Sequence, residues 1–338
     1  MHIPENYLSP STCGVLGVAM VPVWAHAVRR VRETVPREKM PLLGIAAAFC
    51  FLSMMFNIPI PGGTTGHAVC GTLIAILFGP WAACIAVTIA LVIQAVLFGD
   101  GGVLALGANC FNMAFVLPMV GHAIYSLIKE RVEGEKGELL GAAVGSYVAI
   151  NCAALCAAVE FGIQPLLFTN AAGEALYCPY PLAVSVPAML VGHLTIWGAA
   201  EVVFTCGILA FLHAVAPDFG LSSTAATAGE KASAGSRGAV VALLVCLILA
   251  TPLGLLATGD AWGEWGVEDL AGLVGYTPAG MDGAWEWGSL MPDYAIGELP
   301  EWFGYILCAV IGVALLVVIF RLAAAAMRPS VDFDRARA

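Results

Sequence analysis

Charged residues are scarce in this sequence, which limits the kinds of protein that it can encode. Only 11% of its 338 residues are Asp, Glu, Lys or Arg, whereas 60% are hydrophobic. A soluble domain is nearer ~25% charged, and so few charges cannot cover a water-exposed surface of this size. The composition therefore points to a lipid environment. The net charge of −10 also argues against nucleic acid as a partner, because that partner needs clustered positive charge.

Several motifs of common enzymes are also missing. None of the 11 cysteines belongs to a C-x-x-C pair, which argues against a zinc knuckle or a thioredoxin-type redox site. No G-x-x-x-x-G-K-[ST] stretch occurs, so the chain does not bind ATP through a P-loop. The absence of H-E-x-x-H and G-x-S-x-G argues against a zincin-type protease and a nucleophile-elbow hydrolase.

Long apolar runs dominate the rest of the chain and predict membrane-spanning helices of ~20 residues. The expected spans are 12–28, 40–57, 67–79, 81–97, 108–127, 138–162, 183–213, 238–258 and 302–326. Nine spans with the N-terminus outside leave all 14 Lys and Arg residues on the cytoplasmic side, as the positive-inside rule requires. The sequence therefore predicts an all-α integral protein of the cytoplasmic membrane, surrounded by lipid, with its C-terminus in the cytoplasm.

A change in composition divides the chain into two parts. Residues 217–237 are small, polar and flexible, as in a linker. This cytoplasmic linker separates a seven-span domain, residues 1–216, from a two-span hairpin, residues 238–338. The outer loop of the hairpin covers residues 259–301 and is rich in Trp, Gly and acidic residues.

The N-terminus offers an unusual set of metal ligands. Residues 1–28 contain no Lys or Arg, so a signal peptide is not expected, and Met1 should be retained because His2 is large. The Met1 amine, the His2 amide nitrogen and the His2 imidazole Nδ1 can then close two adjacent chelate rings around one metal ion. Ni(II) and Cu(II) favour planar nitrogen ligands of this kind, and Co(II) is a weaker case. An accidental His at position 2 is the alternative.

A second histidine on the outer side could complete a site with four nitrogen ligands. His67 ends the stretch NIPIPGGTTGH, residues 57–67, in which two prolines and three glycines prevent a continuous helix. Irregular backbone at membrane depth survives only where protein or a cavity covers it. The stretch is therefore more typical of a binding loop than of a spacer.

Several stretches resemble the CbiM/NikM family, the substrate-binding (S) components of energy-coupling factor (ECF) transporters for cobalt and nickel. They are MHIPE (1–5), PIPGGTTGH (59–67), FGPWA (78–82), QAVLFGDGG (94–102), LGANCFNM (106–113) and HLTIWGAAE (193–201). The resemblance covers about residues 1–215. The tail, with TPLGLLATG (251–259) in a two-span hairpin, resembles the small N component that is fused to M in some systems.

The resemblance implies a seven-helix S-component bundle followed by a two-helix membrane hairpin. It also implies that Met1, His2 and His67 bind Ni(II) or Co(II), which is the transported substrate, while no permanent cofactor is expected. The chain would not be an enzyme. ATP hydrolysis would occur on cytosolic ATPase subunits, joined to this chain by a transmembrane coupling (T) component. A planar field of four nitrogens leans toward nickel, but the family uses both metals.

Six further polar residues are weaker candidates. Asn109 and Asn112 follow an outer loop and would either hydrogen-bond the site or cap the start of a helix. Thr64 and Thr65 could fix the tautomer of His67. His193 and Glu201, two turns apart in the seventh span, are ionisable residues inside the membrane and hence functional candidates, with simple packing as the alternative.

Two other functional classes remain open from the sequence. A secondary divalent-metal permease would work without an ATPase, although such carriers often have inverted repeats and midplane acids that this chain lacks. An intramembrane metalloenzyme would need an open coordination position and a general base. A planar site of four nitrogens supplies neither in an obvious way.

Overall fold

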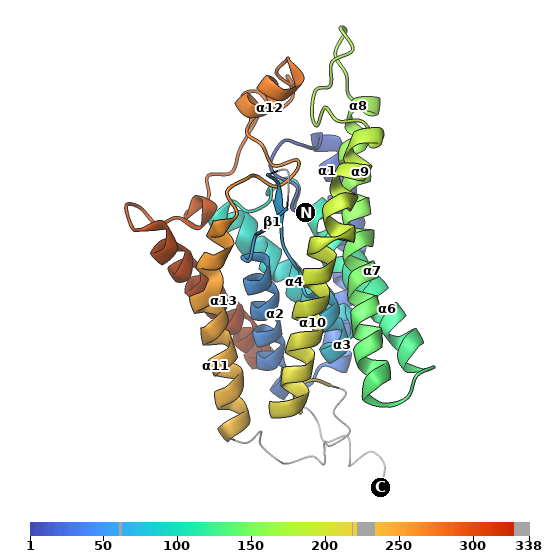
Figure 1. Cartoon of the computed structure of the whole chain (residues 1–338), viewed down its shortest axis with the longest axis vertical. Coiled ribbons are helices and arrows are strands. Elements are labelled where there is room, and N and C mark those ends of the chain that lie inside the picture. Colours follow the sequence, from blue (N-terminus) through green and yellow to red (C-terminus); the bar gives the residue numbers. More distant parts are fainter. Residues whose placement is uncertain (61–62, 218, 222–233, 328–338) are drawn as a thin grey trace.

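Helices form nearly all of the regular structure, which confirms the all-α membrane fold that the sequence predicts (Figure 1). The computed structural model describes residues 1–60, 63–217, 219–221 and 234–327. The short strands in this part of the chain are β1 (Ile58–Pro59) and β2 (Thr65–Gly66), which pair antiparallel. Of the predicted linker at 217–237, residues 218 and 222–233 lie outside the described residues.

The helical elements fall into two groups along the chain. The first domain contains α1 (Pro10–Thr34), η1 (Arg37–Lys39), α2 (Met40–Met54), α3 (Gly71–Phe78), α4 (Pro80–Ile93), η2 (Gln94–Phe98), α5 (Leu106–Asn109), η3 (Cys110–Val116), α6 (Leu117–Lys129), α7 (Gly134–Gly162), α8 (Gln164–Leu167), α9 (Leu182–Leu194) and α10 (Ile196–Val215). The C-terminal hairpin contains α11 (Ala234–Ala250), η4 (Thr251–Leu256), α12 (Val267–Val274), η5 (Pro292–Tyr294) and α13 (Glu301–Ala326).

The described residues contain seven helices that are long and apolar enough to cross a membrane, whereas the sequence predicts nine. The two exceptions are the runs at 40–57 and 67–79, which form α2, with 15 residues, and α3, with eight. Between them lies the irregular segment 55–70, which carries β1 and β2. The run at 183–213 is also divided, because the helix breaks at Thr195 between α9 and α10.

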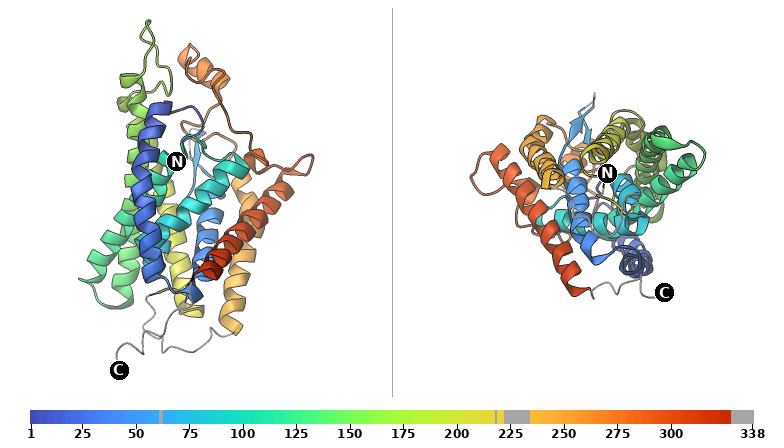
Figure 2. Two further views of the ribbon diagram at one scale, coloured as in Figure 1. Left: turned by 180° about the vertical axis from the view of Figure 1, so that it is seen from behind. Right: turned by 90° about the horizontal axis from the view of Figure 1, so that it is seen from below.

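The two short helices lie in the middle of the bundle. Nearly every residue of α2 and every residue of α3 is buried, whereas α1 exposes much of its surface. Figure 2 shows α1, α6, α7, α10 and α13 arranged around them. A short helix followed by irregular backbone is stable here because protein, rather than lipid, surrounds it and satisfies its polar groups.

The C-terminal hairpin packs directly on this centre through α13. Gly44 of α2 lies against Phe320, and Gly312 of α13 lies against the ring of Phe51, so each helix offers a glycine to an aromatic side chain of the other. Small residues let apolar helices approach closely and gain van der Waals contact where no hydrophobic effect drives association. Gly44 of α2 therefore serves to pack α2 on α13 of the same chain.

The segment between η4 and α13, residues 257–300, lies over the same end of the bundle as the N-terminal segment (Figure 1). The hydroxyl of Tyr7 donates to the carbonyl of Trp265 at 2.6 Å, and the amide of Asn6 donates to the carbonyl of Trp285 at 3.1 Å. Trp262 and Trp265 pack on each other and on Tyr180. The hairpin thus covers the start of the chain.

Gly44→Ala tests the close packing of α2 on α13. An added Cβ would lie 2.9 Å from Phe320 Cβ, so the helices must separate, and we expect the free energy of unfolding to fall by about 1–3 kcal/mol. Gly14→Ala in α1 is the matched control, because a Cβ added there would meet no neighbouring atom within 4 Å. Thermal unfolding in detergent would measure both, and equal melting temperatures would contradict this packing.

Candidate functional site

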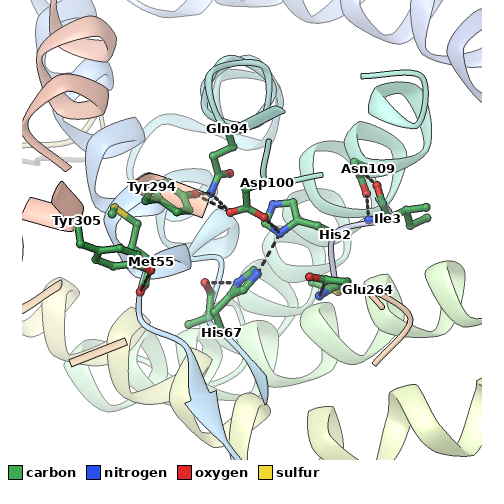
Figure 3. A network of polar contacts seen from close by, with 12 residues as sticks. His2, Ile3, Met55, His67, Gln94, Asp100, Asn109, Glu264, Tyr294 and Tyr305 are labelled. Atoms are coloured by element: carbon green, nitrogen blue, oxygen red, sulfur yellow. Dashed lines mark hydrogen bonds and ion pairs between the residues drawn. The ribbon is translucent and has the colours of Figure 1, made fainter. Parts of the chain in front are cut away.

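The first residues of the chain are buried inside the bundle. Met1, His2 and Ile3 have exposed fractions of 4%, 3% and 0%. The backbone of Ile3 is paired with the Asn109 side chain, whose Oδ1 accepts from the Ile3 amide at 2.8 Å and whose Nδ2 donates to its carbonyl at 3.0 Å (Figure 3). The Gly102 amide donates to the same carbonyl at 2.8 Å. These bonds satisfy buried backbone groups and fix the depth of the N-terminal segment.

Two histidines from distant parts of the sequence meet next to this segment. His2 Nδ1 lies 3.2 Å from His67 Nε2, although the residues are 65 positions apart. His67 Nδ1 lies 3.2 Å from the carbonyl oxygen of Ala68. Since that carbonyl can only accept, we assign the His67 proton to Nδ1, which directs the lone pair of Nε2 toward His2.

Burial favours the neutral form of both imidazoles. Burial lowers the pKa of His2 to about 3, and the charge of the N-terminus adds to this effect. His67 is likewise buried, with an exposed fraction of 5%. Neutral imidazole is the form that binds metal ions, so near pH 7 protons on these rings do not compete with a metal.

Glu201 supports the segment that carries His67. Its carboxylate, projecting from α10, accepts hydrogen bonds from the backbone amides of Val69 at 2.6 Å and Cys70 at 3.0 Å. These are the second and third residues after His67, and Cys70 has a left-handed φ of 60°. A charged acceptor for two adjacent amides fixes the backbone at the point where the extended segment enters α3.

His193 does not reach the pair of histidines. Its Nδ1 bonds to the Met189 carbonyl of its own helix at 2.7 Å, and its ring packs on Trp197. Trp197 in turn donates from its indole nitrogen to the carbonyl of Ile58 at 2.8 Å and lies against Gly66. The two polar candidates of the seventh run therefore have different surroundings. Glu201 contacts the His67 segment directly, whereas His193 contacts Met189 and Trp197.

The other three polar candidates also differ in their contacts. Asn112 donates to Glu160 at 2.7 Å, away from His2 and His67. Thr64 Oγ1 is buried with no hydrogen-bond partner in the described structure. Thr65 pairs with Pro59 in the β-hairpin. The partner of His67 Nδ1 is a backbone carbonyl, so neither threonine is needed to set its tautomer.

Sequence reasoning missed three residues beside His2. Asp100 Oδ1 lies 3.1 Å from His2 Nδ1, and its other oxygen accepts from Tyr294 Oη at 2.6 Å and from Gln94 Nε2 at 3.1 Å (Figure 3). Gln94 and Asp100 belong to the QAVLFGDGG stretch, which contributes to the family resemblance but contains no metal-binding pattern of its own. Tyr294 lies in the C-terminal hairpin, and no local pattern connects it to residues 194 positions earlier.

The N-terminal amine faces an acidic side chain as well. The Met1 nitrogen lies 3.7 Å from Glu264 Oε1, whose side chain is 28% exposed. Within the described ranges, no group of three or more His, Cys, Asp or Glu side chains forms a ready-made metal cluster. Two imidazole nitrogens do converge, and the nitrogens that could join them belong to Met1 and to the His2 backbone.

Comparison with known proteins finds two matched regions in the chain. Residues 2–219 match the family described as CbiM, cobalt uptake substrate-specific transmembrane region, and residues 236–329 match the PDGLE domain. A probable fused nickel transport protein LarMN of Lactiplantibacillus plantarum is 48% identical, with 95% of this chain and 97% of that protein covered. The fused nickel transport protein NikMN of Rhodobacter capsulatus is 46% identical, with 94% and 95% covered.

A solved structure supports the fold of the first domain. The crystal structure of a truncated transition metal transporter is 52% identical, with a TM-score of 0.60, and covers 63% of this chain and 99% of that one. The part of the chain that the structure describes has seven apolar helices long enough to cross a bilayer, so the chain is a multi-pass membrane protein. It belongs to the CbiM family of cobalt uptake substrate-specific transmembrane regions and carries a PDGLE domain after that region.

Proposed function

We propose that this chain is the substrate-capture subunit of an ATP-driven ECF-type transporter that imports Ni(II) or Co(II). The observation that carries the proposal is the 3.2 Å approach of His2 Nδ1 to His67 Nε2 next to a buried Met1. The names of the two full-length relatives, both described as nickel transport proteins, support a transition metal as the substrate.

Four nitrogens would hold the metal. The Met1 amine, the deprotonated His2 amide and His2 Nδ1 form two fused chelate rings, and His67 Nε2 closes the square. Such a field suits Ni(II) well and Co(II) less well. The ligands come from two segments, and different elements of the bundle hold each segment in place. Little conformational entropy would therefore be lost when the metal binds.

The metal would enter from outside the cell. The connections 35–39 and 130–133, next to most of the Lys and Arg residues of the described chain, lie at one end of the bundle, and residues 257–300 lie at the other (Figure 1). The positive-inside rule assigns the first end to the cytoplasm. The N-terminal segment and the acidic hairpin loop would then face the outside, where acidic residues concentrate cations.

Transport itself would require partner subunits. The chain has no P-loop, so ATP hydrolysis would occur on cytosolic ATPases that act through a transmembrane coupling component. Release of the metal would follow from a change in the position of the His67 segment or the N-terminal segment, because each supplies ligands that the other cannot replace.

A one-residue extension before Met1 tests the ligand set. It moves the primary amine away and destroys the first chelate ring, so we expect saturable Ni(II) binding at micromolar metal to be lost. The same residue added after Ala338 is the control. Isothermal titration calorimetry of the purified proteins measures both, and intact mass spectrometry checks that Met1 is retained. Unchanged Ni(II) and Co(II) binding by the extended protein would disprove the N-terminal site.

Glu201→Gln tests the support of the His67 segment. The amide keeps the size of the side chain but loses its charge and one acceptor, and losses of this kind near metal ligands typically weaken affinity by about 10- to 100-fold. Glu160→Gln is the matched control, because Glu160 is a buried glutamate that bonds to Asn112 instead. An equal decrease in Ni(II) affinity in both variants would contradict a specific role.

Uptake of radioactive nickel by cells separates this function from that of a secondary permease. We expect uptake only when the partner ATPases are present, and we expect it to stop when their ATP-binding lysines are replaced. Uptake that persists without any ATPase would favour the permease. Metal-dependent hydrolysis by the purified chain would favour an intramembrane enzyme.

A further inference from the structure

One side chain of the C-terminal hairpin reaches the surroundings of His2. Tyr294 is buried, its ring stacks on Phe98 with centroids 4.7 Å apart, and its hydroxyl donates to Asp100 Oδ2 at 2.6 Å. The other oxygen of Asp100 lies 3.1 Å from His2 Nδ1. Tyr294, Asp100 and His2 therefore form a continuous chain of polar contacts between the hairpin and the first domain (Figure 3).

The backbone around Tyr294 is unusual. Asp293 and Tyr294 have φ values of 53° and 59°, in the left-handed region that non-glycine residues rarely adopt. Strained backbone of this kind persists only where the surrounding structure holds it, and it is concentrated at functional sites. The strain here places one aromatic side chain between Phe98 and Asp100.

Gln94 makes the arrangement more specific. Its Nε2 donates both to Asp100 Oδ2 and to Tyr294 Oη, each at 3.1 Å. Its Oε1 and His2 Nε2 are both buried without a hydrogen-bond partner in the described residues. Asp100 is thus held through Oδ2 by two donors, which leaves Oδ1 directed at the His2 imidazole.

The charge of the proposed site gives this carboxylate a role. A divalent metal bound by a neutral amine, one amidate and two neutral imidazoles carries one net positive charge. Leaving that charge uncompensated in a buried site is costly. Asp100 can cancel it, because its Oδ1 lies only 3.1 Å from His2 Nδ1, the atom that would bind the metal. Glu264 is the other nearby carboxylate, but its Oε1 lies farther from a ligand atom, 3.7 Å from the Met1 amine, and its side chain is 28% exposed against 20% for Asp100.

We propose that Asp100 is the charge-compensating carboxylate of the metal site and that Tyr294 of the C-terminal hairpin is the residue that positions it. This inference rests on the proposed function, because it assumes a metal on His2 and His67. Through the hydroxyl group of Tyr294, the C-terminal hairpin then affects the metal affinity of the first domain.

Tyr294→Phe removes this hydroxyl and keeps the ring on Phe98. We expect Ni(II) affinity, measured by calorimetry on the full-length chain, to fall by about 10- to 100-fold. The visible d–d absorption band of the bound nickel should shift, because the field of the carboxylate changes. Tyr305→Phe is the matched control: Tyr305 is a buried tyrosine of the same hairpin, but its hydroxyl donates to the Met55 carbonyl at 2.9 Å. It should keep the affinity within about two-fold, because the ring that packs on Tyr294 is kept and no hydrogen bond to Asp100 is lost.

A double-mutant cycle tests whether Tyr294 acts through Asp100. Asp100→Asn alone should weaken Ni(II) binding, and Tyr294→Phe should then cause little further loss, because groups in one network are not additive. Additive losses would overturn the proposed route. If Tyr294→Phe does not fold, Gln94→Met removes the other donor to Asp100 Oδ2 and should weaken binding in the same direction.

The outcomes separate this inference from the proposed function. If the one-residue extension abolishes binding but Tyr294→Phe binds nickel normally, the inference is wrong and the proposed function stands. Equal losses in Tyr294→Phe and Tyr305→Phe would mean a general effect of hairpin packing and would also overturn it. If the extended protein binds nickel unchanged, the proposed function itself fails.

Discussion

The insertion of the N-terminal segment into the bundle is the constraint on which the rest of the site depends. An extended backbone cannot satisfy its own polar groups, so each buried amide and carbonyl there needs a partner. The Asn109 side chain and the Gly102 amide supply those partners for Ile3, one residue beyond His2. Once Ile3 is fixed, the Met1 amine and the His2 imidazole can move little. The His2 ring is therefore held at one position next to His67.

The opposite side of the site uses the same principle with different groups. The segment 55–70 leaves helical structure in the middle of the protein, where lipid could not satisfy it. Glu201 accepts from two of its amides, and Trp197 donates to one of its carbonyls. Both side chains project from α10. A single helix therefore holds both the β1–β2 hairpin and the end of the His67 segment next to α3. This explains how an irregular segment can hold a ligand in place.

The C-terminal hairpin closes the arrangement from a third direction. Its α13 packs on α2, directly below the loop, and its outer segment contacts Asn6, Tyr7 and Asp100. The three contacts of the outer segment are hydrogen bonds, in which two hydroxyls and one side-chain amide donate to one carboxylate and two backbone carbonyls. Polar contacts of this kind fix geometry more than they add stability.

The sequence by itself determined the class of the protein and the principal candidate ligands. Scarce charge and long apolar runs require a helical membrane protein, and the chemistry of His at position 2 is local, because its donors are joined by covalent bonds. The convergence of the two imidazoles, and the contacts of Glu201, Asp100 and Tyr294, join residues up to 200 positions apart, and only the tertiary structure decided them. It also decided the lengths of α2 and α3. The physical reason is burial: the ~20-residue rule describes helices that face lipid, and these two are enclosed by protein.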